Sequence, residues 1–550
     1  MSERTTEPLP PYVPITEFKY TAPPNEGWTY GQPVASTADG NAWVEGEDEG
    51  WTVFNTEQED PRKLYLLLLS AIVPRPIALV STVSLEGREN LAPFSWFNQV
   101  TPYPPIVSIS ILHRAHSAKD TLQNILDIKQ FTANLISEPW VQQANISAID
   151  TPSDVGEWPM TGLTKAPCVH VRPPRVKESA CSFECELLQT VNIKDPATGD
   201  ITTTLVLGSI KHIHVRNDVL NERGMIDPGK MKPVARMAGV GYARISEGYH
   251  IPLPSWSASQ DAIRASVPWL EHSSSSNLEG VGYTHISEYK LTTSPNPTWK
   301  FGQPVESSPE GQAWLEGEKA GWTVIDTQKD DRRTWMGRRR QLYQFLVSAV
   351  VPRPIALVST ISEEGVENLA PISWFNQVSP YPTVISLSIS RRDQAAKDTL
   401  RNILATKEFT ANLISEAWIE QAHAASIDTP PEVSEWEITG LTKAPCLKVR
   451  TARVKESACS MECELLQSID INDPDTGLTK NTLVLGAVKY IHVRNDVLDP
   501  ASGTIDPGKM KPIARMGAGG YAKITEGYRM ARPDVDAALE AVRTGQCGPQ

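Results

Sequence analysis

One long block of sequence occurs twice in this chain, and this repetition limits the possible folds more than any other feature. The first copy spans residues 73–121 and begins VPRPIALVST, and the second spans residues 351–399 and begins with the same letters. Within the block, LAPFSWFNQV in the first copy differs from LAPISWFNQV in the second at one position. A repeat of this length is a whole domain rather than one unit of a solenoid. We therefore expect two copies of one domain.

The duplication extends beyond this block. The segment ITEFKYTAPPNEGWTYGQPV, from Ile15, returns as ISEYKLTTSPNPTWKFGQPV from Ile286. A chain of 550 residues is too long for a single hydrophobic core, which agrees with two domains. Each copy has an arm and a core domain: residues 1–60 and 61–250 in the first copy, and residues 286–340 and 341–530 in the second. A Ser- and Pro-rich linker with one short helix in DAIRASVPWL spans residues 251–285, and a tail spans residues 531–550.

The overall charge argues against one class of partner. A net charge of −13 and a pI near 5.4 supply no basic face for the phosphates of nucleic acid. No apolar run reaches the length of a membrane-spanning helix. The polar, proline-rich start MSERTTEPLPPYVP lacks the pattern of a signal or transit peptide. The sequence thus predicts a cytoplasmic protein that binds neither nucleic acid nor membrane.

The repeated cysteines do not have the spacing of a metal site. CSFEC, which contains Cys181 and Cys185, lies in ACSFECELLQTV, and this segment alternates like a strand. On a strand, residues four apart are separated by about 13 Å, too far for one zinc ion or a disulfide. We expect buried thiols and no bound metal.

Each arm carries spaced tryptophans and few periodic apolar runs. They are Trp28, Trp43 and Trp51 in the first arm and Trp299, Trp314 and Trp322 in the second. We expect an irregular arm that packs on the domain through these rings. The alternative is an aromatic lid over a planar ligand.

Each core domain combines many short strands with a few helices. IALVSTVS followed by SLEG is typical of a hairpin, and IVSISIL alternates like a half-buried strand. KDTLQNILDIKQ has helical spacing at Leu122, Ile125 and Leu126, with Ser117 or Asp120 available as its cap. SEPWVQQANISAID is a second expected helix, and further strands are expected in FTANLIS, ACSFECELLQTVNI, TTTLVLGSIKHIHV and GYARIS. Because regular βαβ alternation is lacking, we predict a mainly β fold with a closed barrel in each copy.

No familiar catalytic motif stands out. The sequence contains no GxGxxG, no Walker lysine loop and no HExxH. His113 and His212 are not kept in the second copy, and the repeated His214 and His492 lie in expected strands, where a structural histidine is typical. The catalytic residues are therefore unknown at this stage.

The repeat does preserve residues suited to an anion and a planar ring. Free N–H groups and a lysine at a helix N-terminus suit a phosphate, and Arg114 or Arg392 would add a second cation. The helix starts are Lys119, Asp120 and Thr121, and Lys397, Asp398 and Thr399. Polar residues on nearby strands would bond the edge of a heterocycle: Ser81, Thr82, Asn90, Ser95 and Asn98, with Ser359, Thr360, Asn368, Ser373 and Asn376. Alternatively, KDT only caps a surface helix and the polar strand residues satisfy the backbone.

The order of motifs resembles the flavin reductase-like family, which has an FMN-binding split barrel. The motifs are PRPIALVST, NLAPFSWFN, an alternating strand, KDTLxNI, G-x-(I/V)-K-x-I-H-V, and P-(V/I)-A-R-M before a Gly-rich turn and Tyr. They cover about residues 66–249 and 342–528. The Gly-rich turn departs from the usual family pattern as RMAGVGY in the first copy and RMGAGGY in the second.

The resemblance implies an FMN site in each copy, with the phosphate near the KDT helix start and the ring along the N-x-A-P-x-S strand. In the first copy it implies phosphate contacts from Arg114, Lys119 and Thr121, and ring or ribityl contacts from Thr82, Ala92, Phe94, Ser95 and Asn98. In the second copy the matching residues are Arg392, Lys397, Thr399, Thr360, Ala370, Ile372, Ser373 and Asn376.

Members of this family are typically homodimers with flavins at the interface, so the tandem copies imply two split barrels forming a pseudo-dimer within one chain. A higher oligomer stays open. The implied chemistry is hydride transfer from NADH or NADPH to FMN, or to FAD, which needs stacked rings more than a protein acid or base. Two alternatives stay open: a flavin-dependent oxidase or oxygenase acting on a specific small organic substrate, and a non-enzymatic flavin-binding protein.

Overall fold

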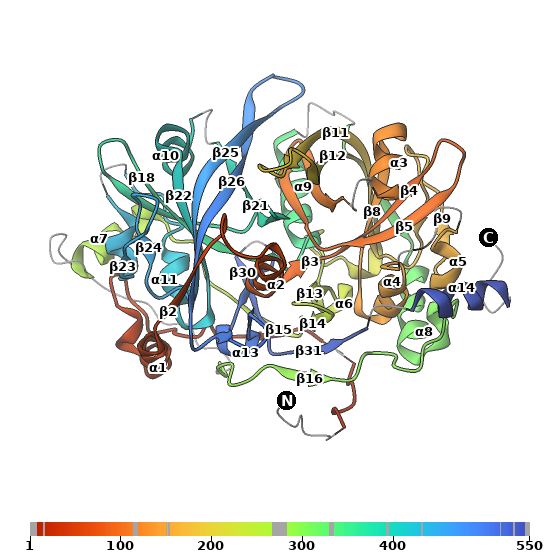
Figure 1. Cartoon of the computed structure of the whole chain (residues 1–550), viewed down its shortest axis with the longest axis horizontal. Helices are drawn as coiled ribbons and strands as arrows, with labels where there is room; N and C mark the ends of the chain where they lie inside the picture. Colours follow the sequence, from red (N-terminus) through yellow and green to blue (C-terminus); the bar gives the residue numbers. More distant parts are fainter. Residues whose placement is uncertain are drawn as a thin grey trace.

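Two similar barrels lie side by side and share strands with each other (Figure 1). The computed structural model describes residues 8–14, 17–113, 119–149, 151, 155–266, 283–328, 335–391, 395–430, 433–517, 519–531 and 534–544. Mainly β structure with a few helices is confirmed.

Each barrel is one antiparallel sheet. The first runs in the order β5-β4-β8-β11-β12-β7-β6. Its strands are β4 (Ala78–Val83), β5 (Glu89–Phe94), β6 (Phe97–Pro102), β7 (Pro105–Leu112), β8 (Gln130–Leu135), β11 (Cys181–Lys194) and β12 (Ile201–Arg216). No pairing joins β5 to β6 among the described strands, so the barrel is split there and not closed.

The second barrel repeats this order as β19-β18-β22-β25-β26-β21-β20. Its strands are β18 (Ala356–Ile361), β19 (Glu367–Ile372), β20 (Phe375–Pro380), β21 (Thr383–Ser390), β22 (Glu408–Leu413), β25 (Cys459–Asn472) and β26 (Thr479–Arg494). Cys181 and Cys185 on β11, like Cys459 and Cys463 on β25, are buried thiols on strands, as predicted.

The predicted KDT helices form in both copies as α3 (Asp120–Ile128) and α10 (Asp398–Thr406). Leu122 and Ile125 bury the apolar face of α3 against the barrel. The cap position is Lys119 rather than Asp120, and no side chain makes a capping hydrogen bond; Ser117 lies outside the described residues. Lys129 ends α3 with a left-handed φ of 62°.

The remaining elements are short. The helices are α1 (Ala38–Glu45), α2 (Pro61–Ala71), α4 (Val141–Ile146), α5 (Trp158–Thr161), α6 (Pro228–Met231), α7 (Trp256–Ser266), α8 (Pro309–Glu316), α9 (Trp335–Ala349), α11 (Ile419–Ala424), α12 (Glu435–Thr439), α13 (Pro507–Met510) and α14 (Val535–Arg543). The strands are β1 (Lys19–Thr21), β2 (Trp51–Asn55), β3 (Arg75–Pro76), β9 (Lys165–Ala166), β10 (Arg175–Val176), β13 (Val234–Arg236), β14 (Gly241–Arg244), β15 (Glu247–His250), β16 (Lys290–Thr292), β17 (Trp322–Asp326), β23 (Lys443–Ala444), β24 (Arg453–Val454), β27 (Leu498–Asp499), β28 (Thr504–Ile505), β29 (Ile513–Arg515), β30 (Gly520–Lys523) and β31 (Glu526–Arg529). None of the described helices is long and apolar enough to cross a membrane.

The arms are exchanged between the two copies. The first arm adds β2 to β26 of the second barrel, and the second arm adds β17 to β12 of the first. The Trp43 indole N–H donates to the Glu456 carbonyl (2.9 Å), and the Arg494 guanidinium lies over the Trp43 ring at 4.2 Å. The tryptophans therefore pack, as expected, but on the other copy's barrel.

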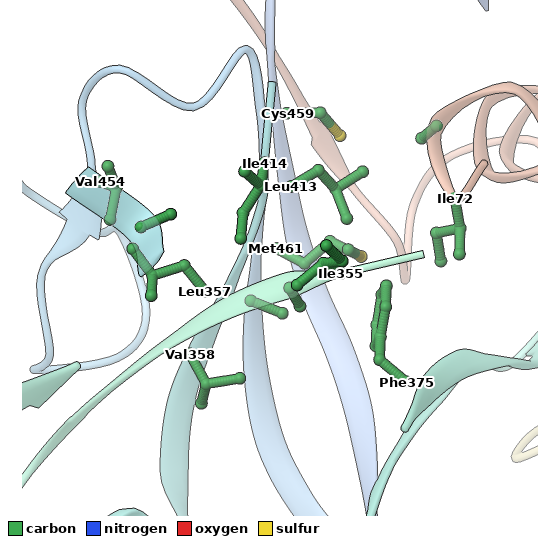
Figure 2. Packing of buried hydrophobic residues seen from close by; sticks show 14 of the residues in the cluster. Ile72, Ile355, Leu357, Val358, Phe375, Leu413, Ile414, Val454, Cys459 and Met461 are labelled. Atoms are coloured by element: carbon green, nitrogen blue, oxygen red, sulfur yellow. The ribbon is translucent and has the colours of Figure 1, made fainter. Parts of the chain in front are cut away.

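The helix before each barrel is exchanged in the same way. Leu64, Leu67 and Leu68 of α2 are fully buried in the hydrophobic core of the second barrel. Figure 2 shows Ile72, just after α2, among second-barrel residues such as Ile355 and Phe375. Each fully buried leucine contributes about 2 kcal/mol to the free energy of unfolding.

Strands of the two copies also join directly. β14 pairs with β31 and β15 with β30. The Asn98 side-chain amide donates to the Phe375 carbonyl (2.9 Å), and Asn376 makes the matching bond to the Phe97 carbonyl (3.0 Å). The predicted internal pseudo-dimer is confirmed.

We predict that residues 1–260, expressed alone, form a homodimer. The apolar face of α2 and the strand β2 then require the barrel of a second molecule, because their own partner barrel is missing. Size-exclusion chromatography with light scattering would measure the mass. A stably folded monomer would contradict the importance of this exchange.

Candidate functional site

A cavity of about 410 Å³ lies beside the first barrel, within the usual size range of small-molecule sites. Its walls come from α2, β5, β7, the start of α3, the segment after α4 and the turn after β13. Of the eight residues that the resemblance implies for the first site, five line it: Ala92, Phe94, Ser95, Lys119 and Thr121; Asn90 and Asp120, also selected from the sequence, line it as well.

One end of the cavity is the N-terminus of α3. The Asn90 amide donates to the Thr121 hydroxyl (2.9 Å), which fixes the first turn against β5. The side chain of the cap residue Lys119 makes no capping hydrogen bond, and the first N–H groups of the helix and its dipole favour an anion at this end. The two requirements of the predicted phosphate site are thus brought together.

A carboxyl group lies at the same end. Glu157 accepts hydrogen bonds from the Leu91 backbone N–H (3.0 Å) and the Thr151 hydroxyl (2.9 Å). Burial raises the pKa of Glu157, against the opposing effect of these two hydrogen bonds.

The opposite part of the cavity is lined by two arginines, Arg75 and Arg236, that the sequence analysis did not select. Arg75 is fully buried and donates to the carbonyls of Leu69 (2.8 Å), Ile72 (2.6 Å) and Met237 (3.0 Å). Its Nε has no hydrogen-bond partner among the described residues. Burial and the nearby Arg236 lower the pKa of Arg75 to about 9, so it remains charged at neutral pH.

A chain of hydrogen bonds closes the cavity toward the other copy. The Tyr242 hydroxyl donates to the Asn145 amide oxygen (2.9 Å), and the Asn145 amide donates to the Ala531 carbonyl (3.1 Å). Val535, in the tail that follows the second copy, lines the cavity, and the Arg236 guanidinium lies over the Tyr242 ring at 4.5 Å. Both halves of the chain therefore bound this site.

The other predicted residues of the first copy lie elsewhere. Thr82 is fully buried beneath α3 and accepts a hydrogen bond from Asn124 (3.1 Å). Asn98 lies in the seam between the barrels, as described above, and neither residue lines the cavity. Arg114 is outside the described residues.

The matching cavity of the second copy is smaller, about 150 Å³. Of the predicted residues, only Ser373 lines it; Ala370, Ile372, Lys397 and Thr399 do not. Thr399 accepts from the Asn368 amide (2.9 Å). Thr360 accepts from Asn402 (3.1 Å), Asn376 lies in the seam, and Arg392 is outside the described residues.

His423 is a site residue that the sequence analysis missed. It takes the place of Asn145, lines the second cavity and is buried. Its Nε2 lies 2.8 Å from the Pro252 carbonyl, which can only accept, so Nδ1 accepts from the Tyr521 hydroxyl at 2.8 Å. The change from PWVQQANISAID to AWIEQAHAASID was the available signal.

The fold defines a duplicated split-barrel protein, and its first barrel borders a cavity in the size range of small-molecule sites. The sequence model for the flavin reductase like domain matches residues 69–235 and 348–512, more than half of the chain. The chain belongs to the flavin reductase-like family, in which flavin is the bound cofactor, and it carries the domain twice.

Similar proteins cover one copy at a time. An uncharacterized protein of Aquifex aeolicus is 36% identical over 192 residues, which are 35% of this chain and 94% of that protein. The uncharacterized protein YwrF of Bacillus subtilis is 34% identical over 194 residues, again 35% of this chain and 94% of its own length. Nitrilotriacetate monooxygenase component B from Bacillus cereus, a solved structure, is 30% identical, covering 36% of this chain and 97% of that chain with a TM-score of 0.35.

We predict that His423→Asn reduces the loss of stability in acid. Burial, and to a smaller extent Arg515, lower the pKa of His423 to about 4, against the opposing effect of its bond to Pro252. Between its ordinary value near 6.5 and 4, the unfolded chain binds a proton that the folded chain does not, so stability falls as the pH falls. This effect amounts to about 3 kcal/mol between pH 7 and pH 4.

Urea unfolding at pH 7 and pH 4 measures this difference between wild type and variant. The Asn145→His variant is the matched control and should gain an acid-dependent loss of similar sign. An identical pH dependence in wild type and His423→Asn would contradict the buried neutral histidine.

Proposed function

We propose that the chain is an FMN-binding oxidoreductase that passes a hydride from NADH or NADPH to a flavin held in the first cavity. The observation that supports it most directly is that one cavity is lined by Arg75 and Arg236 at one end and by Lys119 and the first turn of α3 at the other. FMN has hydrogen-bond acceptors for both ends of the cavity: its phosphate oxygens suit the helix N-terminus, and the acceptors on the edge of its ring suit the arginines.

The residues present fit the cofactor by their chemistry. Lys119 and the first turn of α3 would hold the phosphate, with Thr121 adding a hydroxyl. The segment Ala92 to Ser95 would follow the ring, because three apolar residues at the end of β5 and the hydroxyl of Ser95 line the cavity there. Arg75 and Arg236 would hold the electron-rich edge of the ring.

Two aromatic side chains give the cavity a wall suited to ring systems. Tyr65 and Trp96 both line it, and their rings meet edge to face with centroids 6.3 Å apart. Such a wall excludes water and orients a planar molecule without donating a proton.

No acid or base of the chain is required for the central step. Bound FMN supplies a ring that accepts a hydride from a reduced nicotinamide. The chain's part is to bind and orient the cofactor, and the positive charge of Arg75 and Arg236 would favour added electrons in the ring. This agrees with the lack of a repeated catalytic histidine in the sequence.

The visible spectrum of the purified protein tests the proposal. We expect a flavin spectrum that is bleached by anaerobic addition of NADH or NADPH, and flavin released by denaturation that is identified as FMN by chromatography. A colourless protein that fails to bind added FMN would overturn the proposal. If the bound flavin stayed oxidised with both NADH and NADPH, the proposed hydride transfer would be wrong, although the proposed flavin binding would stand.

We predict that Lys119→Ala weakens FMN binding by about 1.5–3 kcal/mol, the usual contribution of a hydrogen bond to a charged group. Titration of flavin-free protein with FMN, followed by flavin fluorescence, gives the dissociation constant. Lys300→Ala, at an exposed lysine outside the cavity, is the control and should leave it unchanged. If the two variants bound FMN with equal affinity, KDT would only begin a helix and would not form a phosphate site.

A further inference from the structure

A helix ends each copy of the repeat. PDVDAALEAVR, which contains α14, and PSWSASQDAIR, which contains most of α7, each begin five residues after the matching tyrosines Tyr528 and Tyr249. The tail and the linker therefore carry the same element of the repeat. Its contacts can be compared between the two copies.

The helix α14 docks on the first copy, although it follows the second barrel in the chain. Ala538 is fully buried and Ala541 nearly so, and both belong to a small hydrophobic cluster with Ile149 and Met160 of the first copy. Met160 lies in α5, and Figure 1 shows α14 beside that helix. The terminal helix is thus exchanged between the copies, like the arms and α2.

The matching helix α7 docks in the same way on the second copy. Ile263 is fully buried in one cluster with Ile427 and Ile438. These last two isoleucines occupy the places that Ile149 and Met160 have in the first copy. Because the same contact is made twice with different apolar side chains, docking of this helix on the other copy is a property of the repeat.

The exchanged arm reaches the same place. The Gly302 backbone N–H donates to the Met160 carbonyl (2.8 Å), and this bond ties the second arm to α5. Trp299 and Phe301 of the same arm pack in the cluster that buries α14. The helix therefore docks where the first copy and the second arm meet.

Beside this cluster, α14 forms part of the wall of the first cavity. Val535, in its first turn, is half-buried and lines the cavity. Ile149 also lines the cavity and packs in the cluster with α14. Just before the helix, the Ala531 carbonyl accepts from the Asn145 amide (3.1 Å), and Asn145 is a third lining residue. A movement of α14 would therefore open the wall of the cavity.

The contact that holds α14 in place is small. The two fully or nearly fully buried side chains described for this helix are the alanines of the cluster, whereas Asp536, Ala537 and Glu540 are exposed. An alanine buries much less apolar area than the leucines that anchor α2. Segments with few buried apolar contacts open at a lower free-energy cost than the core does. This helix can therefore leave the barrel while the barrel stays folded.

We propose that α14 is the cover of the first site. It opens to admit FMN and the reduced nicotinamide, and when it is docked Val535 limits the space for the molecule that lies beside the flavin. The proposal rests on the proposed function, since it assigns the cover to the flavin site. Covers of this kind exclude water from a reaction and control entry and release.

The rate of FMN release from the full-length holoprotein tests the cover. Ala538→Arg places a charge in the apolar cluster and should undock α14. We expect FMN release, followed by the fluorescence of free FMN after dilution, to become at least fivefold faster. Ala537→Arg, at the neighbouring exposed position, is the matched control and should release FMN as wild type does. Unchanged release in a folded Ala538→Arg protein would overturn the cover.

A second variant keeps α14 docked and narrows the site instead. Val535→Trp introduces the residue that α7 carries at the matching position, Trp256, so the helix accommodates it. With the donor that reduces the flavin, NADH or NADPH, we expect KM to rise at least threefold while kcat and the circular dichroism spectrum stay unchanged. An unchanged KM in this folded variant would overturn the assignment of Val535.

The same measurements separate the two proposals. Wild-type protein that binds no FMN would overturn the proposed function and this inference together. Wild-type protein that binds FMN and is reduced by a nicotinamide, but whose FMN release and KM do not respond to Ala538→Arg and Val535→Trp, would overturn this inference alone.

Discussion

The structure depends on the burial of one helix face in the barrel of the other copy. Leu64 and Leu68 of α2 lie in the second core, while Tyr65 and Leu69, on the adjacent face, line the first cavity. One helix therefore belongs to the core of one domain and to the ligand site of the other. Since apolar burial supplies most of the free energy of folding, neither site wall is formed unless both barrels are present.

The sequence predicted the duplicated domain, the main strands and both KDT helices, because local periodicity and the repeat itself specify them. It did not reveal the exchange of the arms. Trp43 and Trp314 occur in the same context in both copies, so nothing in either arm says which barrel receives it. The alternating strands alone favoured a closed barrel, because alternation predicts strands but not whether the last strand pairs with the first, whereas the resemblance implied the split barrel that is observed.

The site was predicted in part. Lys119 and Thr121 follow from the chemistry of a helix N-terminus, which a sequence shows directly. Arg75 was missed because PRP reads as the start of a strand, and only the fold reveals that its guanidinium is buried with an unsatisfied Nε. Asn98 has the polar character expected of a ring contact, yet its amide bonds the Phe375 carbonyl across the seam. A polar residue that occurs in both copies can bond across the interface between them as readily as it can contact a ligand.

Joining the copies in one chain allows the two sites to differ, which a homodimer does not. Asn145 and neutral His423 can replace each other because both accept from a tyrosine hydroxyl and donate to a backbone carbonyl. Each site therefore keeps a hydrogen-bond chain from a tyrosine to the backbone of the segment that follows the other barrel, at Ala531 in the first site and at Pro252 in the second. The residues that line each cavity beyond this hydrogen-bond chain are not the same type, since Leu253 of the linker lines the second cavity and Val535 of α14 lines the first. The seam that holds the pseudo-dimer together is thus preserved while the cavities diverge.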